Sequence, residues 1–213
     1  MMHVDLATFS SSPFPHGQGG GVFGLGTYAE MLATWPSESS FQELKGAYRK
    51  FSLSERCNRE QYAEFVTKHP VWRPFHDYIK TATFRDMVFG VFRQQGVTFP
   101  RGTYYARFEF SSLPADGGRI APHRDIPSKV LTIVVPMTAA EVPGWGTDIL
   151  EPLVPVGKDY ESPRDAFRTV ASFDYAPNSF GLFAKTENSW HAIGPLKGAA
   201  GYRRTLTLNI ELV

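Results

Sequence analysis

Before residue 100, apolar residues recur every three or four positions, which is the spacing of one face of an α-helix. Ser40 and Glu43 stand at capping-box spacing and predict the start of one helix, whose apolar positions are Phe41, Leu44, Tyr48 and Phe51. Asn58 and Thr83 are positioned to cap two further helices, with apolar stripes formed by Tyr62, Phe65 and Val66 and by Met87, Val88, Val91 and Phe92. The glycine-rich stretch 17–26 predicts a loop.

After residue 100 the pattern changes to an alternation of apolar and polar residues, the period of a β-strand with one buried face. The alternation predicts strands over 104–112, 130–135, 146–150, 168–173, 180–184 and 203–213. Short strands at such spacing favour a closed or double-sheet β architecture, with the N-terminal helices packed on one side. We therefore expect an α+β, mainly β fold.

Composition and charge narrow the classes of function. The chain has 213 residues, the length of one domain, and its 22 Lys and Arg residues nearly balance 21 Asp and Glu residues. A net charge of +1 argues against the basic field of a nucleic-acid binder. The single cysteine, Cys57, excludes an intramolecular disulfide and a multi-cysteine zinc site. With no secretory pattern at the start and no apolar run of membrane-spanning length, we expect a cytoplasmic enzyme or binding domain.

The first candidate for chemistry is the segment around His123 and Asp125. These two residues are separated by one position, so on an extended chain their side chains project to the same side. An imidazole and a carboxylate on one face are two ligands for a divalent metal, although the same pair also occurs in ordinary surface turns. His191, 66 residues beyond Asp125, would complete a set of three ligands. Two histidines and one carboxylate form the facial triad typical of non-haem Fe(II) oxygenases.

The second candidate is the last predicted strand. On this strand Arg203, Thr205 and Thr207 share one face, and Arg204 and Leu206 share the other. Arginine binds a carboxylate with two hydrogen bonds, and a threonine hydroxyl adds a donor. The first face therefore predicts a clamp for a dicarboxylate. Arg204 is the competing clamp residue, and the alternation favours Arg203.

Over residues 100–213 these motifs resemble the 2-oxoglutarate/Fe(II)-dependent oxygenases. The resemblance includes the segments 117–123 before the first ligand, 177–183 before the last ligand, 190–193 around His191 and the strand 203–207. The segment 146–150 is similar to the glycine-rich strand that many small members carry after the first ligands. Residues 1–99 match nothing so specific, and auxiliary helices vary within the family.

The resemblance implies a double-stranded β-helix (a jelly roll, cupin-like) with N-terminal helices packed on it. Residues 1–213 would form one domain, with a helical part over 1–99 and the jelly-roll core over 100–213. The resemblance also implies that His123, Asp125 and His191 bind Fe(II). Arg203, assisted by Thr205 or Thr207, would bind 2-oxoglutarate.

The implied reaction consumes O2 and 2-oxoglutarate, releases succinate and CO2, and hydroxylates or otherwise oxidises a C–H bond of a small molecule. With the Asp125 carboxylate present, the resemblance implies oxidation rather than chlorination. The near-neutral charge favours a free metabolite over nucleic acid or a large protein, and an amino acid, a peptide or another metabolite stays open as the substrate. Arg107 is a further candidate for binding 2-oxoglutarate or an acidic substrate, although a salt bridge with Glu109 or a neighbour also explains it. Thr132 could line the co-substrate pocket, although a β-branched residue in a strand needs no such role.

Two other functions are compatible with the motifs. A metal-dependent cupin enzyme would not use 2-oxoglutarate and would not need the clamp strand. A non-catalytic jelly-roll module would bind a ligand without turnover. Loss of activity in Arg203→Ala separates the first from the oxygenase, and a visible charge-transfer band with Fe(II) and 2-oxoglutarate in the absence of air separates the second.

Overall fold

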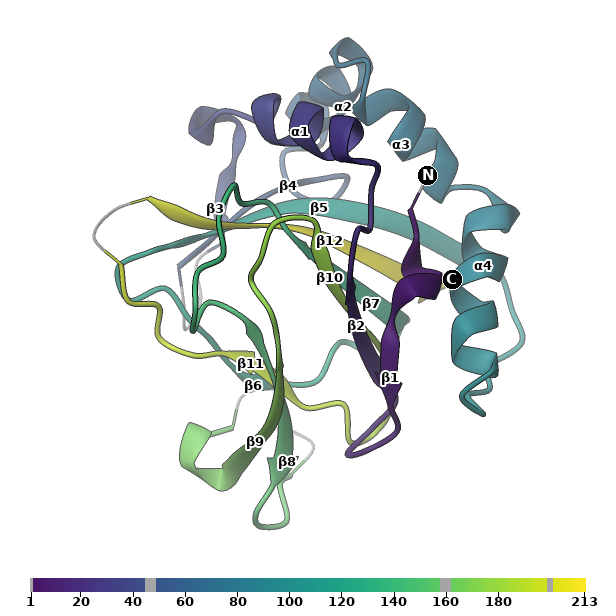
Figure 1. Ribbon diagram of the computed structural model, residues 1–213, viewed down its shortest axis with the longest axis vertical. Coiled ribbons are helices and arrows are strands. Elements are labelled where there is room, and N and C mark those ends of the chain that lie inside the picture. The colour runs from purple at the N-terminus through teal and green to yellow at the C-terminus, as the bar shows by residue number, and fades with distance from the viewer. Residues whose placement is uncertain (1, 45–48, 158–161, 199–200) are drawn as a thin grey trace.

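The computed structural model describes residues 2–44, 49–157, 162–198 and 201–213. Within these ranges two antiparallel β-sheets lie face to face, and helices cover the outer face of the larger sheet (Figure 1). The predicted mainly β fold with helices packed on one side is therefore confirmed. No helix in the described ranges is long and apolar enough to cross a membrane.

The larger sheet has eight strands in the order β1-β2-β10-β7-β12-β5-β4-β3. Their bounds are β1 Thr8–Ser10, β2 His16–Gly20, β3 Gln42–Leu44, β4 Lys50–Ser54, β5 Tyr104–Pro114, β7 Lys129–Pro136, β10 Ser179–Ala184 and β12 Tyr202–Leu212. Strand β12 pairs with β5 along its whole length on one side and with β7 on the other. The long strands that begin and end the predicted β region thus form the centre of the sheet.

The smaller sheet has four strands in the order β6-β11-β8-β9. Their bounds are β6 Ile120–His123, β8 Thr147–Pro152, β9 Phe167–Phe173 and β11 His191–Ile193. The helices are α1 Leu25–Ala33, α2 Arg59–Lys68, α3 Trp72–Ile79 and α4 Ala82–Arg93, and short 3-10 helices cover Val4–Leu6, Glu38–Ser40 and Arg164–Ala166. In Figure 1 the smaller sheet lies below the larger one, on the side opposite α1, α2 and α3.

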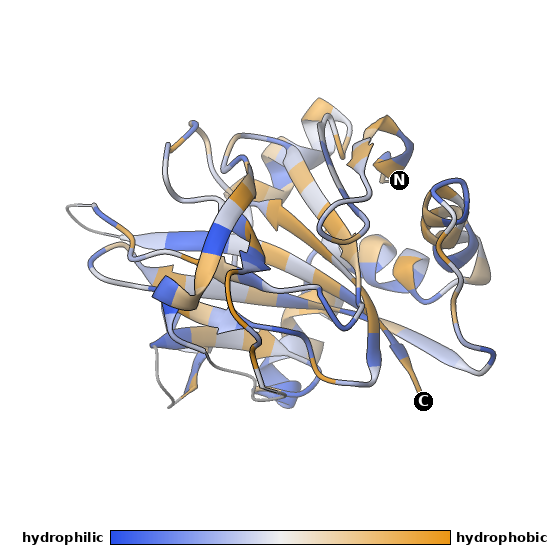
Figure 2. Ribbon diagram, turned by 90° about the horizontal axis from the view of Figure 1, so that it is seen from below, coloured by the Kyte–Doolittle hydropathy of each residue, from blue (hydrophilic) through white to orange (hydrophobic). Residues whose placement is uncertain are grey.

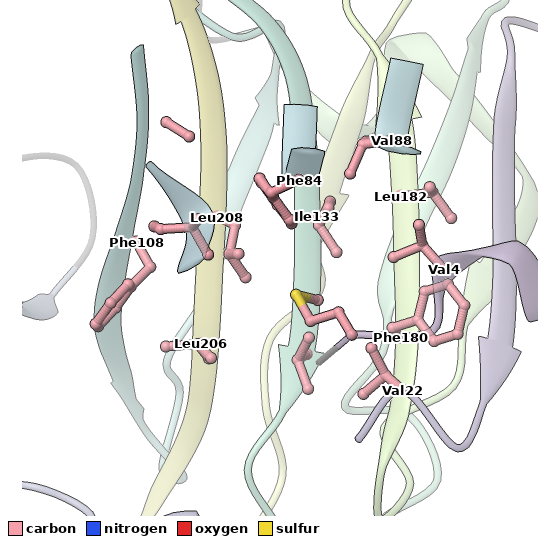
Figure 3. Close-up of a cluster of buried hydrophobic side chains, with 14 of the residues drawn as sticks. Val4, Val22, Phe84, Val88, Phe108, Ile133, Phe180, Leu182, Leu206 and Leu208 are labelled. Carbon is pink, nitrogen blue, oxygen red and sulfur yellow. The ribbon is translucent and has the colours of Figure 1, made fainter. Parts of the chain in front are cut away.

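The two faces of the larger sheet differ in polarity. Apolar side chains of the central strands are buried against apolar side chains of the helices. Figure 3 labels, on the strands, Phe108 of β5, Ile133 of β7, Phe180 and Leu182 of β10 and Leu206 and Leu208 of β12, and, on the helix, Phe84 and Val88 of α4. Burial of each such side chain is worth roughly 1.5–3 kcal/mol. A shift of one residue in β12 would turn the polar positions toward the helices, so this layer fixes the register. Figure 2 shows the same alternation as changes between hydrophobic and hydrophilic positions along the strands.

Two predictions for the N-terminal part are wrong. The segment after Ser40 is not a helix: Gln42–Leu44 and Lys50–Ser54 form the antiparallel strands β3 and β4, and Tyr48 lies outside the described residues. The buried residues Leu53 and Phe110 are cross-strand partners in β4 and β5, and this pairing with a long central strand overrides the local helical spacing. The predicted loop over 17–26 is also partly wrong, since His16–Gly20 forms β2.

The glycines of β2 permit close packing. A Cβ atom at Gly19 would lie 2.9 Å from the ring of Phe180 and from the carbonyl oxygen of Leu6. The absence of a side chain at Gly19 lets β2 lie close to Phe180 of β10 and to the backbone of Leu6.

The other predicted elements are present. Helix α2 follows Asn58, whose side chain does not cap it but donates to the carbonyl oxygen of Ser40. Helix α4 is capped by Thr81 rather than Thr83, because the Thr81 hydroxyl accepts a hydrogen bond of 3.2 Å from the Phe84 N–H. All the strands predicted after residue 100 are confirmed, with ends that differ by one or two residues. The short strands β1, β6 and β11 and the helices α1 and α3 were not predicted.

Candidate metal centre

The smaller sheet brings His123, Asp125 and His191 together. His123 ends β6 and His191 begins β11, and the two residues are direct cross-strand partners. Their ring centroids are 4.2 Å apart. One ligand atom from each histidine and from Asp125 lies within 4.8 Å of the others. Two neighbouring strand ends therefore place two imidazoles and one carboxylate around a single point.

Hydrogen bonds to the backbone orient both imidazoles. Nδ1 of His123 lies 2.9 Å from the carbonyl oxygen of Ala121, and Nδ1 of His191 lies 3.0 Å from that of Ser189. A carbonyl oxygen only accepts, so each Nδ1 carries the proton and each Nε2 has its lone pair available for a metal. Burial and the neighbouring His191 lower the pKa of His123 to about 3, and burial lowers the pKa of His191. Both rings are therefore neutral, the form that binds a metal.

The Asp125 carboxylate is held by two side chains of β7. Lys129 Nζ lies 2.6 Å from Oδ1, and the Thr132 hydroxyl donates to Oδ2 over 2.6 Å. Thr132 in turn lies 3.0 Å from Oδ1 of Asn209 on β12. Burial would raise the pKa of the Asp125 carboxyl, but the Lys129 charge and these hydrogen bonds outweigh it and hold the pKa well below its ordinary value. The group is thus a fixed carboxylate.

Arg203 is a buried cation whose hydrogen-bond partners in the described residues are neutral. Its guanidinium donates to the carbonyl oxygen of Trp145 at 2.6 Å and to the hydroxyls of Thr205 at 2.7 Å and Thr147 at 3.2 Å. It also lies 5.1 Å from the ring centroid of Tyr175. Burial lowers the pKa of Arg203 to about 10, so it stays charged at neutral pH. No carboxylate in the described residues forms an ion pair with it.

One cavity connects Arg203 with the three candidate ligands. Its volume is about 90 Å³. Its lining includes every residue of the predicted ligand set and clamp, namely His123, Asp125, His191, Arg203, Thr205 and Thr207, and also Thr132. A buried positive charge without an anion is costly, so this end of the cavity is built to receive an anionic group.

Solved structures share this architecture. HygX from Streptomyces hygroscopicus, determined with nickel and 2-oxoglutarate bound, is similar with a TM-score of 0.58 and 9% identity over 93% of this chain and 83% of HygX. A prolyl-4-hydroxylase from Pseudomonas putida has a TM-score of 0.56 and 12% identity over 93% of this chain and 92% of its own. The non-heme alpha-ketoglutarate-dependent epimerase SnoN from nogalamycin biosynthesis has a TM-score of 0.56 and 13% identity over 92% of this chain and 76% of SnoN.

The chain has the double-stranded β-helix fold of the 2-oxoglutarate/Fe(II) oxygenases. No protein-family model and no curated protein sequence matches it.

The donor set of this oxygenase fold fits Fe(II) and 2-oxoglutarate. Two neutral imidazoles and one carboxylate are the donors of a facial triad, which leaves coordination positions open. The carbonyl groups that hold each Nδ1 proton are the outer contacts expected around such ligands. Arg203 supplies an uncompensated charge in the same cavity. The residues present therefore suit both groups.

The two other arginines that the sequence offered as candidates, Arg204 and Arg107, do not line this cavity. Arg204 is on the opposite face of β12, and its backbone N–H and carbonyl oxygen bind the Tyr175 hydroxyl. Arg107 forms an ion pair of 2.8 Å with Glu211 and lines a separate cavity of about 590 Å³ beside α2 and α3. The salt bridge expected for Arg107 thus forms with Glu211, and its side chain is not brought to the candidate ligands.

Sequence reasoning missed three polar residues of the cavity. Thr147, Lys50 and Ser111 line it together with Lys129 and the candidate ligands. Lys50 was missed because its segment was interpreted as a helix. The alternation of Lys50, Ser52 and Ser54 with Phe51 and Leu53 is the signal that could have identified a strand with one polar face.

Proposed function

We propose that the protein is an Fe(II)- and 2-oxoglutarate-dependent dioxygenase that hydroxylates a C–H bond of a small molecule. His123, Asp125 and His191 would hold the iron, and Arg203 with Thr205 would bind the distal carboxylate of 2-oxoglutarate. Bound Fe(II) would supply the activation of O2 coupled to decarboxylation of 2-oxoglutarate to succinate and CO2. Thr132 would keep the Asp125 carboxylate in place, and Thr207 would line the co-substrate end of the cavity.

The observation that carries the proposal is the shared cavity of Arg203 and the three candidate ligands. A metal-dependent cupin enzyme that uses no keto acid would not need a buried guanidinium, and the partners of this one are only a carbonyl oxygen and two hydroxyls. A 2-oxoglutarate dianion has one carboxylate for the metal and one for this guanidinium. The buried Arg203 therefore favours the oxygenase over the cupin alternative.

The direct test is the release of CO2 from 2-oxoglutarate labelled at C1, in air with Fe(II), across a library of small metabolites. We expect a member of the library to stimulate release in the wild-type protein and in Arg204→Leu, with succinate formed in equal amount. Release should fall in Arg203→Leu and be lost in His191→Ala. Oxidation of a metabolite without 2-oxoglutarate would support the cupin alternative, and metabolite binding without CO2 release would support a binding module.

The product of the oxidised metabolite decides the type of oxidation. A gain of one oxygen atom, detected by mass spectrometry, is the expected outcome for a hydroxylase. A product of unchanged mass and inverted stereochemistry would instead indicate an epimerase, the activity of the structurally similar SnoN.

A further inference from the structure

The inner face of the larger sheet continues beyond Arg203 as a polar wall. Across β12 and β5, Thr205 is opposite Ser111 and Thr207 is opposite Glu109. Across β5 and β4, Ser111 is opposite Ser52. Direct cross-strand partners point to the same face of a sheet. Strands β4 and β5 therefore present polar side chains on the face that carries Arg203.

The smaller sheet packs against one end of this wall. At that end Leu113 of β5 packs with Ile193 and Leu196 in a small apolar cluster. Two residues further along the same face of β5, Ser111 lines the cavity of the candidate ligands, and Glu109 follows it. The wall thus changes from apolar to charged beside the cavity.

Beside the cavity the wall carries an ion pair between Lys50 and Glu109, and further along the same face Arg107 pairs with Glu211. Lys50 Nζ lies 2.7 Å from Glu109 Oε1, and each side chain is 19% exposed. Burial would raise the pKa of Glu109, but the positive charges of Lys50 and Lys129 keep it below its ordinary value. Lys50 itself lines the cavity that contains His123, Asp125 and His191. A fixed positive and a fixed negative charge therefore lie at the side of the candidate metal centre.

We propose that the substrate oxidised at this centre is a small zwitterion of the free amino-acid type, whose carboxylate binds Lys50 and whose ammonium binds Glu109. The proposal rests on the proposed function. An apolar substrate would remove water from both charges without replacing its hydrogen bonds. An anion alone would be repelled by Glu109 and a cation alone by Lys50. A peptide bond carries neither charge, so the wall favours the free amino acid over a peptide.

The test measures binding by saturation-transfer NMR on the protein loaded with Zn(II) and 2-oxoglutarate. The probes are the free L-amino acids, each compared with its N-acetyl amide, which lacks both charges. The 2-oxoglutarate signal in the same sample reports separately whether the co-substrate site works. The variants are Glu109→Gln, Lys50→Met and the double variant, which leaves no unpaired charge in the wall. Glu64→Gln and Lys68→Met remove charges from an exposed ion pair on α2 and serve as matched controls.

We expect at least one free amino acid to bind and its N-acetyl amide not to bind. Glu109→Gln, Lys50→Met and the double variant should each weaken this binding about 30-fold or more, with 2-oxoglutarate still bound. The control variants should bind like the wild-type protein. Bound 2-oxoglutarate with no amino-acid binding, or equal binding of the N-acetyl amide, would overturn the zwitterion proposal alone. Loss of 2-oxoglutarate binding in Lys50→Met would also overturn it, because Lys50 would then belong to the co-substrate site. Absence of 2-oxoglutarate binding in the wild-type protein would overturn the proposed function as well.

Discussion

Arg203 shows how a single residue can carry a functional argument. Its guanidinium is buried, and its contacts are a carbonyl oxygen, two hydroxyls and an aromatic ring. None of these groups carries a negative charge, so the free energy of the buried cation improves when an anion enters the cavity. Alternation along the strand favoured Arg203 over Arg204 from the sequence. The contacts with Trp145 and Thr147 could not be predicted, since they come from a loop and a strand more than 50 residues away.

Replacing this guanidinium tests the clamp. Arg203→Leu should weaken 2-oxoglutarate binding about 10- to 100-fold, because charge-assisted hydrogen bonds to the distal carboxylate are lost. Arg204→Leu, on the other face of β12, should leave the dissociation constant close to that of the wild-type protein. Isothermal titration calorimetry on the Zn(II)-loaded proteins measures both values. The opposite order of the two variants would place the clamp on the other face of the strand.

The neutral histidines of the candidate centre make stability depend on pH. The folded protein keeps His123 neutral down to a pKa of about 3, whereas the unfolded chain takes up this proton near the ordinary value of 6.5. The free energy of unfolding should therefore fall as the pH falls below about 7. For His123 alone the loss is about 2 kcal/mol between pH 7.5 and 5.

Urea unfolding of the metal-free protein at several pH values measures this slope. His123→Asn should give a flatter dependence of the free energy of unfolding over the same range. An equal slope in the variant and the wild-type protein would show that His123 is not held neutral by the fold.

At the scale of elements, the contact between the two sheets depends on one glycine. A Cβ atom at Gly181 of β10 would lie 2.0–2.5 Å from ring atoms of Phe173 on β9. The absence of a side chain at Gly181 lets the ring pack directly on the larger sheet. Phe173 and Phe183 belong to the apolar cluster behind the candidate ligands, and the ring of Phe183 lies 4.5 Å from that of His191. The packing of the sheets therefore helps to position one of the histidines.

Gly181→Ala should destabilise the protein by about 1–3 kcal/mol, because Phe173 must move to make room. Gly90→Ala in α4 is the matched control: its Cβ would meet no atom within 4 Å, and alanine favours a helix by roughly 0.5–1 kcal/mol. Thermal unfolding followed by circular dichroism measures both. A stable Gly181→Ala protein would contradict the close contact between the sheets.

Local patterns predicted the type of an element where its own residues decide it. The strands of the larger sheet after residue 100 alternate because one face packs on the helices and the other carries the polar residues that line the cavity. The segment from Gln42 to Ser54 was misread, since its conformation depends on pairing with β5 far along the chain. The short strands β6 and β11 carry the candidate ligands but have too few residues for a periodic signal. The candidate ligands were predicted from residue chemistry and resemblance instead.

At the scale of the whole molecule, the candidate centre joins segments that are far apart in sequence. The cavity has walls from β4, β5, β6, β7, β8, β10, β11 and β12. Spacing alone indicated which residues could be ligands, but only the paired sheets show that Lys50 and Ser111 share their cavity. A metal held by these elements would stabilise the native fold, since the unfolded chain has no preformed site.

Metal binding should therefore raise the melting temperature. At a free Ni(II) concentration of about 100 times the dissociation constant, the stabilisation is about 2.7 kcal/mol, which corresponds to roughly 5–10 °C for a chain of this length. Differential scanning fluorimetry with and without Ni(II) measures the shift. His191→Ala, compared in the same way with its own metal-free form, should show little or no shift. An undiminished shift in this variant would place the metal elsewhere.

The most direct test of the account is an anaerobic titration of the Fe(II)-loaded protein with 2-oxoglutarate, followed by visible absorption. If His123, Asp125 and His191 hold the iron and Arg203 holds the keto acid, a charge-transfer band should appear and saturate at one equivalent. The band should be absent in His191→Ala and should need far more 2-oxoglutarate in Arg203→Leu. A folded wild-type protein that binds iron and gives no band, or an unchanged band in His191→Ala, would contradict the assignment of this centre.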